Sequence, residues 1–101
     1  MNMLFMAVCK HTAEMCPAGI VRPDRKFATS LEEHIKKIGI DLVGGYLDGP
    51  GHEFYFLFET DDQSKLMSVL VPLMQIGDVK TVPVVKFSDV VALTRKLGIQ
   101  E

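Results

Sequence analysis

The sequence has no strong excess of either charge, few cysteines and no long hydrophobic run. Its 11 basic and 13 acidic residues give a formal net charge of -2, whereas a protein that wraps nucleic acid normally carries a strong basic excess. Two cysteines are too few for a disulfide-dense scaffold. No apolar run approaches the roughly 20 residues that a membrane-spanning helix needs. We therefore expect neither a nucleic-acid partner nor a membrane.

The chain has 101 residues, of which 48% are hydrophobic and 24% charged. This length and composition predict a single globular domain over residues 1–101. The apolar residues 1–8 have neither the basic flank nor the cleavage site of a signal peptide. Without a secretory signal, Cys9 and Cys16 are expected to be reduced thiols rather than a disulfide. These features predict a cytoplasmic protein.

Four segments have hydrophobic patterns typical of strands: residues 3–9, 40–47, 53–59 and 79–87. The first is continuously apolar, as in a buried central strand. The third alternates cleanly and places three phenylalanines on one face, and the Gly- and Pro-rich residues 48–51 before it predict a hairpin. Pro83 favours an edge position for the fourth strand.

Three helices are expected between and after these strands. The first begins at Pro23 and carries apolar residues at spacings of four, four and three until Gly39 ends it. The second begins at a capping box in residues 60–63 and ends at Gly77. Ser88 is expected to cap a short C-terminal helix.

The resulting order, β-α-β-β-α-β plus a helix, predicts an α+β fold of the ferredoxin-like, split βαβ type. Two helices would cover one face of its sheet and leave the other open. Apolar residues occupy both faces of the first and third strands, and an exposed apolar sheet face usually marks a partner. Stacking two sheets across a two-fold axis would bury it. We therefore expect a homodimer formed through the open sheet face.

The densest group of reactive side chains lies where the first strand ends: Cys9, His11, Glu14 and Cys16. Strands one and three are neighbours in a ferredoxin-like sheet, so His52, at the start of strand three, is expected to approach His11. Thiolate and imidazole are the preferred ligands of zinc, copper and soft iron sites, and a carboxylate adds an oxygen.

Two interpretations of this group stay open, besides a purely scaffolding dimer. In the first, the protein binds a transition metal (zinc, iron or copper) or a small metallo-ligand through His11, Glu14, Cys16 and His52. In the second, it is a small enzyme acting on a small organic molecule in a sheet-lined cavity. There His11 or His52 would be the general base, with Tyr55 or Glu14 as proton partner. The first is favoured narrowly, because no complete acid–base set is visible.

Simpler interpretations exist for several of these residues. Cys9 is favoured as a small buried hydrophobe, and His11 and His52 can equally hydrogen-bond loop backbone. Arg22 and Arg25, near the first helix start, could hold an anion, although a solvated face is the simpler account.

Two short motifs carry a family resemblance: His-Thr-x-Glu-x-Cys-Pro at residues 11–17 and Pro-Gly-His-x-x-Tyr at residues 50–55. They resemble those of a group of small uncharacterised prokaryotic proteins within the dimeric α+β barrel superfamily, which the order of elements resembles over nearly the whole chain. The resemblance implies a homodimeric barrel. The cofactor-independent monooxygenases of that superfamily often combine Asn, Trp and His, but this chain has no Trp and Asn2 is its one Asn. No catalytic set carries over.

Overall fold

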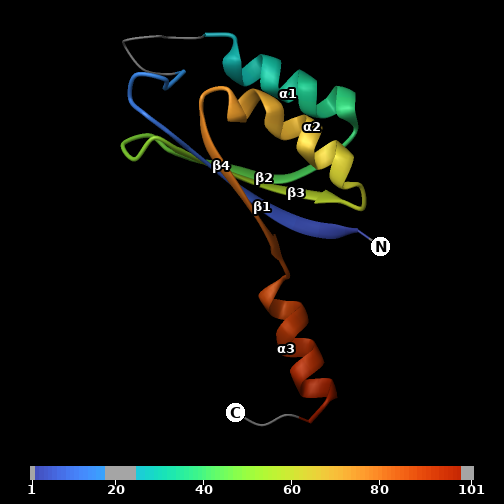
Figure 1. Cartoon of the computed structure of the whole chain (residues 1–101). Coiled ribbons are helices and arrows are strands. Elements are labelled where there is room, and N and C mark those ends of the chain that lie inside the picture. Colours follow the sequence, from blue (N-terminus) through green and yellow to red (C-terminus); the bar gives the residue numbers. More distant parts are fainter. Residues whose placement is uncertain (1, 18–24, 99–101) are drawn as a thin grey trace.

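The structure, a computed structural model, describes residues 2–17 and 25–98. Its elements are β1 (Met3–His11), α1 (Phe27–Ile38), β2 (Asp41–Asp48), β3 (Glu53–Thr60), α2 (Gln63–Met74), β4 (Gly77–Val84) and α3 (Phe87–Lys96). The four strands form an antiparallel sheet in the order β2-β3-β1-β4, and α1 and α2 cover one of its faces (Figure 1). This α+β architecture is consistent with the predicted ferredoxin-like fold. Among the described helices, none has the length and apolar character needed to cross a membrane.

The hydrophobic core lies between the sheet and helices α1 and α2. Alternate residues of β1 are buried on this side, and the series ends at His11. Helix α1 contributes the buried Leu31 and Ile35, so the predicted apolar stripe is confirmed. The largest fully buried side chains are Phe58, Leu73, Val69 and Cys9. The core therefore runs up to the end of β1, where His11 lies.

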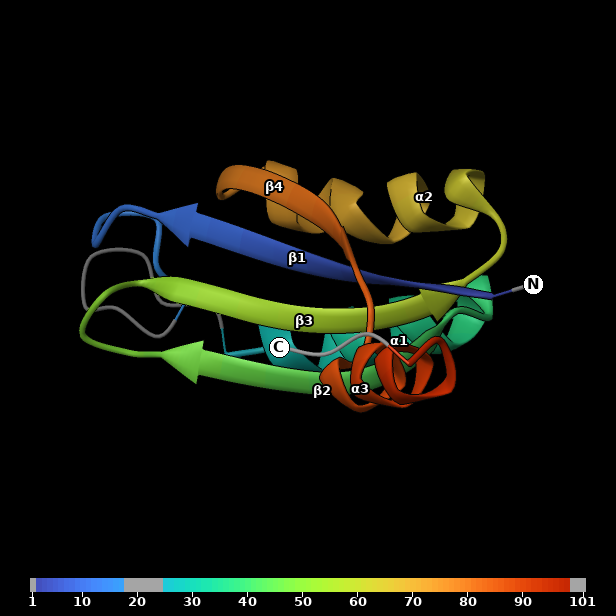
Figure 2. The ribbon, with the colours of Figure 1, turned by 90° about the horizontal axis from the view of Figure 1, so that it is seen from below.

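The sheet places β1 at its centre and β4 at one edge. Figure 2 looks onto the uncovered face and shows β1 and β3 side by side. Because β1 has a partner on each side, its continuous apolar run is explained. The edge position of β4 agrees with the prediction from Pro83, whose missing N–H is tolerated there.

The start of α2 differs from the predicted capping box over residues 60–63. Asp62 is the N-cap, and its carboxylate accepts from the backbone N–H groups of Ser64 and Lys65 at 2.8 and 3.4 Å. The Thr60 hydroxyl instead accepts from the N–H of Asp62 at 3.0 Å. The prediction of Thr60 as the cap was wrong because β3 continues through this residue.

Pairing with β1 sets the bounds of β4 and corrects two further predictions. Gly77 begins β4 rather than ending α2, because β1 extends to His11 and Gly77 is its partner. The strand therefore lies earlier in the chain than the predicted 79–87. Ser88 lies inside α3, whose N-cap is Lys86 without a side-chain capping bond.

Only the C-terminal end of helix α1 can be compared with its prediction. Its first residue is Phe27, and the predicted start at Pro23 lies outside the described residues. Gly39 ends the helix in the left-handed conformation, with φ of 80°, and its N–H donates to the carbonyl of Ile35. The predicted stop at Gly39 is confirmed.

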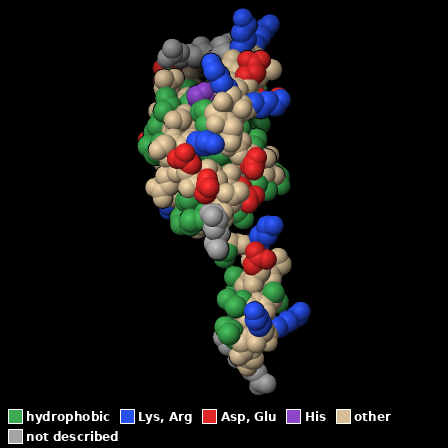
Figure 3. All heavy atoms as spheres, turned by 90° about the vertical axis from the view of Figure 1, so that its right-hand side faces the viewer, with side chains coloured by type: hydrophobic (Ala, Val, Ile, Leu, Met, Phe, Trp, Pro, Cys, Tyr) green, Lys and Arg blue, Asp and Glu red, His purple; other side chains and the backbone are tan. Residues whose placement is uncertain are grey.

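Helix α3 stands apart from the rest of the fold. It extends from β4 on the side of the sheet opposite α1 and α2 (Figure 1), and Figure 3 shows it as an arm below the body. None of its residues is buried, and Phe87 is 81% exposed. The Cα radius of gyration is 16.2 Å, compared with about 13 Å for a compact chain of this length. Within residues 2–17 and 25–98, the apolar face of α3 therefore has no cover.

Candidate metal centre

The candidate site lies where β1 ends beside the start of β3. The N–H of His11 donates to the carbonyl of His52 at 3.0 Å, one step beyond the Lys10–Glu53 pair of the ladder. His52 closes the preceding hairpin turn with φ of 54°. The sheet hydrogen bonding therefore brings the two imidazoles together, as the strand order predicted.

A tight turn after β1 carries Cys16 back to the histidines. The N–H of Met15 donates to the Thr12 carbonyl at 3.1 Å, and that of Cys16 to the Ala13 carbonyl at 3.4 Å. The Thr12 hydroxyl also accepts from Met15 N–H at 3.3 Å. These bonds reverse the chain within five residues of His11, which returns the thiol to the end of the strand.

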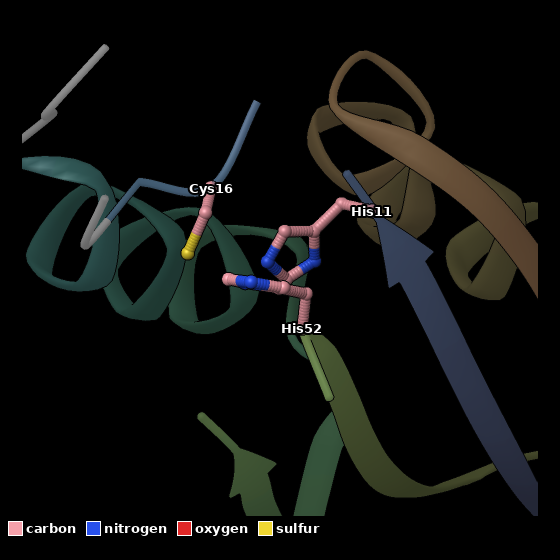
Figure 4. Close-up of side chains that lie close together, drawn as sticks. All are labelled: His11, Cys16 and His52. Atoms are coloured by element: carbon pink, nitrogen blue, oxygen red, sulfur yellow. The ribbon is translucent and has the colours of Figure 1, made fainter. Parts of the chain in front are cut away.

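The three side chains converge. Figure 4 shows His11, Cys16 and His52 pointing toward one another from β1, the following turn and the start of β3. One ring nitrogen of each histidine and the Sγ of Cys16 all lie within 4.8 Å of one another. Ligand atoms around a tetrahedral zinc ion lie about 3.3 to 3.7 Å apart. Side-chain movements of about 1 Å are enough to complete such a site.

Three of the four imidazole nitrogens have no hydrogen-bond partner among the described residues. Nδ1 and Nε2 of His11 and Nδ1 of His52 are buried without a hydrogen bond. Most buried polar side-chain atoms in folded proteins are hydrogen-bonded, so three such atoms in one place require an explanation. A metal ion bound by one nitrogen of each histidine would account for part of this set.

Electrostatics favour the neutral form of His11. Burial lowers the pKa of His11 below its ordinary value, and the neighbouring His52 lowers it further. The neutral imidazole is the form that binds a metal. At neutral pH His11 therefore does not have to lose a proton before it can act as a ligand.

Cys9 faces the same side of the sheet as His11 but belongs to the core. Its thiol donates to the carbonyl of Leu73 in α2 at 3.7 Å. Burial, with a smaller contribution from Asp78, raises its pKa to about 11. A thiol in this state is a poor nucleophile and a poor ligand, which agrees with its interpretation as a buried hydrophobe.

The structure does not bring Glu14 or Tyr55 to the site. Glu14 is exposed in the turn after β1 and is not in the group. Tyr55 pairs with Val8 and so faces the opposite side of the sheet from His11. Its hydroxyl donates to the carboxylate of Glu53. The histidine–tyrosine pair, one of the two acid–base pairs that the enzyme interpretation offers, is therefore not formed across the sheet.

Two residues of the site were not recognised from the sequence. The ring of Phe54 lies 4.6 Å from that of His11, although the phenylalanine stripe was assigned only to the core. Gly77 pairs with His11, and a Cβ at this position would lie 2.9 Å from the His11 Cα and 2.3 Å from the Lys10 carbonyl oxygen. The alternation of β3 is the signal that places Phe54 on the site face. For Gly77 the sequence carries no such signal, because its place beside His11 follows from the register of β1 against β4.

The fold and the site together define a small α+β protein with a His/Cys/His cluster at one end of its sheet. Within this class, the chain belongs to the family described as a domain of unknown function, DUF3303, whose model matches residues 3–98. No curated protein matches the sequence. The family description assigns no activity, so the function has to be inferred from the site.

Proposed function

We propose that this protein binds a transition-metal ion through His11, Cys16 and His52. The observation that carries the proposal is the set of buried imidazole nitrogens without hydrogen-bond partners, next to a thiol in the same small space. If the histidines only held loop backbone, these nitrogens would have backbone partners among the described residues. Two imidazoles and a thiolate suit zinc, copper and iron.

Three protein ligands leave one position of a tetrahedral site for water or an exogenous ligand. Glu14 is exposed on the turn that carries Cys16 and is not required for this set. Both cysteines are free thiols, and we place the protein in a reducing compartment, the cytoplasm, where Cys16 stays available as a ligand.

Metal titration of the purified full-length chain tests the proposal. The protein is stripped with a chelator under reducing conditions and titrated with Co²⁺ and, in competition with a chromophoric chelator, with Zn²⁺. We expect about one ion per chain and a thiolate-to-cobalt charge-transfer band. His11→Ala, His52→Ala and Cys16→Ser should each weaken binding by about 100-fold or more.

Matched controls are available in the same chain. His34 lies on α1, where its Nε2 contacts the Ser68 carbonyl at 2.9 Å, and Cys9 lies in the core. His34→Ala and Cys9→Ala should keep the metal affinity and the cobalt spectrum. The absence of stoichiometric binding in the parent protein, or equal losses in the two controls, would contradict the proposal.

We also propose a homodimer formed through the open sheet face. The face carries half-buried apolar side chains, among them Met6, Val8 and Leu57, and the 68% exposed Tyr46. The unpartnered helix α3 lies on the same side. Facing a second copy would cover both surfaces at once.

A charge placed on this face tests the dimer. Val82 pairs with Met6 and is 37% exposed on the open side, whereas Val71 is 44% exposed on α2. By light scattering after gel filtration we expect a dimer for the parent and for Val71→Lys. Val82→Lys should be a monomer because it would bury an unpaired charge. A monomeric parent protein would refute the dimer.

A further inference from the structure

A cavity lies between α1 and the strands β2 and β3, apart from the three candidate metal ligands. Its volume is about 540 Å³, and none of the three proposed metal ligands lines it. This size falls within the range of about 300–1,000 Å³ that small-molecule sites occupy. Its walls are mainly apolar and include Phe27, Leu31, Ile35, Leu47, Phe54 and Phe56.

Part of the apolar wall is exposed to solvent on the edge strand. Leu42 and Leu47 pair with Phe58 and Phe54, so both face the side of the sheet that α1 covers. They are nevertheless 42% and 71% exposed, because α1 does not reach over β2 closely enough to bury them. A bound hydrocarbon would cover these side chains and remove their apolar surface from water.

In the described part of the cavity, one charged side chain lacks an ion pair, and its charge is positive. Among the described residues, Arg25 and Glu32 are the charged ones that line it. Glu32 pairs with Lys36 at 3.3 Å, whereas Arg25 forms no ion pair within the described part of the chain. A guanidinium binds a carboxylate with two parallel hydrogen bonds. The cavity is therefore complementary to a molecule with one negative group.

The positive charge of Arg25 lies at one end of the cavity, and apolar walls extend from it toward the other end. Arg25 lies two residues before the start of α1, at the end of the cavity that also holds Leu47 and Phe54. Ile35 and Leu42 lie toward the other end. We propose that this cavity binds a hydrophobic monocarboxylate, with its carboxylate at Arg25 and its hydrocarbon along α1. Aliphatic and aromatic acids share this chemistry.

Binding is measured by methyl NMR on the metal-free full-length protein, so the result does not depend on the metal centre. The probes are octanoate, 1-naphthoate and the neutral 1-octanol. We expect the acids to shift the methyl signals of Leu31, Ile35 and Leu47 and to leave Leu4 and Leu57, on the opposite face, unchanged. The ratio of the two acid affinities separates an aliphatic from an aromatic ligand. Octanoate should bind about fivefold to tenfold more tightly than 1-octanol.

Two pairs of variants locate the ligand. Arg25→Gln should remove the preference for octanoate over 1-octanol, whereas Lys37→Gln, in the last turn of α1 and outside the cavity lining, should keep it. Ala28 lines the cavity and is exposed, so Ala28→Phe should block both probes without disturbing the core. Ser30→Phe, exposed but outside the cavity lining, is its control.

The inference is overturned by any of three results. The first is no shift of the cavity methyl groups at millimolar octanoate. The second is shifts at Leu4 and Leu57 in place of those in the cavity. The third is equal affinity for octanoate and 1-octanol in the parent protein.

Discussion

The N–H of His11 donates to the carbonyl oxygen of His52 at 3.0 Å, and the two imidazole rings lie edge to face with their centroids 5.7 Å apart. This hydrogen bond extends the β1–β3 ladder and directs both side chains to one face. Two proposed ligands are thus positioned by the sheet itself, and a short turn supplies the third. Changes to the sheet near His11 should therefore affect metal binding as strongly as changes to the ligands.

Zinc should stabilise the folded protein. A ligand that binds only the native state contributes about 2.7 kcal/mol when its free concentration is 100 times its dissociation constant. For a domain of this length this corresponds to a rise in Tm of about 10 °C or more. Scanning calorimetry should show this rise for the parent and for His34→Ala but not for His52→Ala. A rise of the same size in His52→Ala would place the metal elsewhere.

Gly77→Ala should damage both the fold and the metal centre. The added methyl group would meet the Lys10 carbonyl oxygen and the Cα of His11, so β4 and β1 have to separate locally. We expect a loss of about 1–3 kcal/mol in the free energy of unfolding and weaker zinc binding. Gly49→Ala is the control, because a Cβ there meets nothing within 4 Å. Unchanged zinc affinity in a folded Gly77→Ala protein would show that the site tolerates this shift.

The ionisation of Tyr55 should depend on Glu53. The Glu53 carboxylate accepts a hydrogen bond from the Tyr55 hydroxyl and raises the pKa of Tyr55, and burial raises it further. The unfolded chain releases this proton at a lower pH than the folded chain. The stabilisation is therefore complete below about pH 10 and is lost as the pH rises through the folded pKa.

An alkaline absorbance titration in a Tyr46→Phe background isolates Tyr55, since the chain has two tyrosines. Glu53→Gln should move the tyrosinate transition to lower pH. Coinciding titration curves with and without Glu53→Gln would mean that this hydrogen bond does not form in solution.

Asp62→Ala should destabilise the fold through the start of α2. Its carboxylate accepts from two N–H groups that have no partner within the helix. We expect a loss of about 1 kcal/mol in the free energy of unfolding, measured by urea denaturation. Asp61→Ala removes a neighbouring exposed carboxylate without a capping bond and should have little effect. Similar losses in both variants would indicate a general charge effect rather than capping.

Much of the fold follows from hydrophobic periodicity. The continuous run in β1, the alternation in β3 and the stripe of Leu31 and Ile35 in α1 are each visible within a single segment of the sequence. Each pattern therefore indicates which residues of that segment are buried. The ends of elements were less predictable, because they depend on distant partners. Gly77 belongs to β4 because β1 reaches His11, and nothing near Gly77 in the sequence indicates this.

The candidate site was also predictable only in part. Strand order brought His52 to His11, since it follows from the sequence of elements alone. Both Glu14 and Cys16 were predicted as ligands. Which of them reaches the histidines depends on the turn bonds of Thr12 and Ala13, which composition does not specify. The alternation of β3 places Tyr55 on the face opposite Phe54. The register that puts His11 on the Phe54 side, which the sequence does not specify, therefore separates Tyr55 from the histidines.

At the proposed metal site, the backbone conformation of His52 lowers stability while its side chain is placed among the candidate ligands. With φ of 54°, this residue adopts a left-handed conformation that costs an L-amino acid on the order of 1 kcal/mol and that glycine adopts freely. His52→Gly would relieve this strain while removing a proposed ligand. The chain thus keeps a residue that its own turn disfavours, as expected where the local sequence serves ligand binding rather than maximal stability.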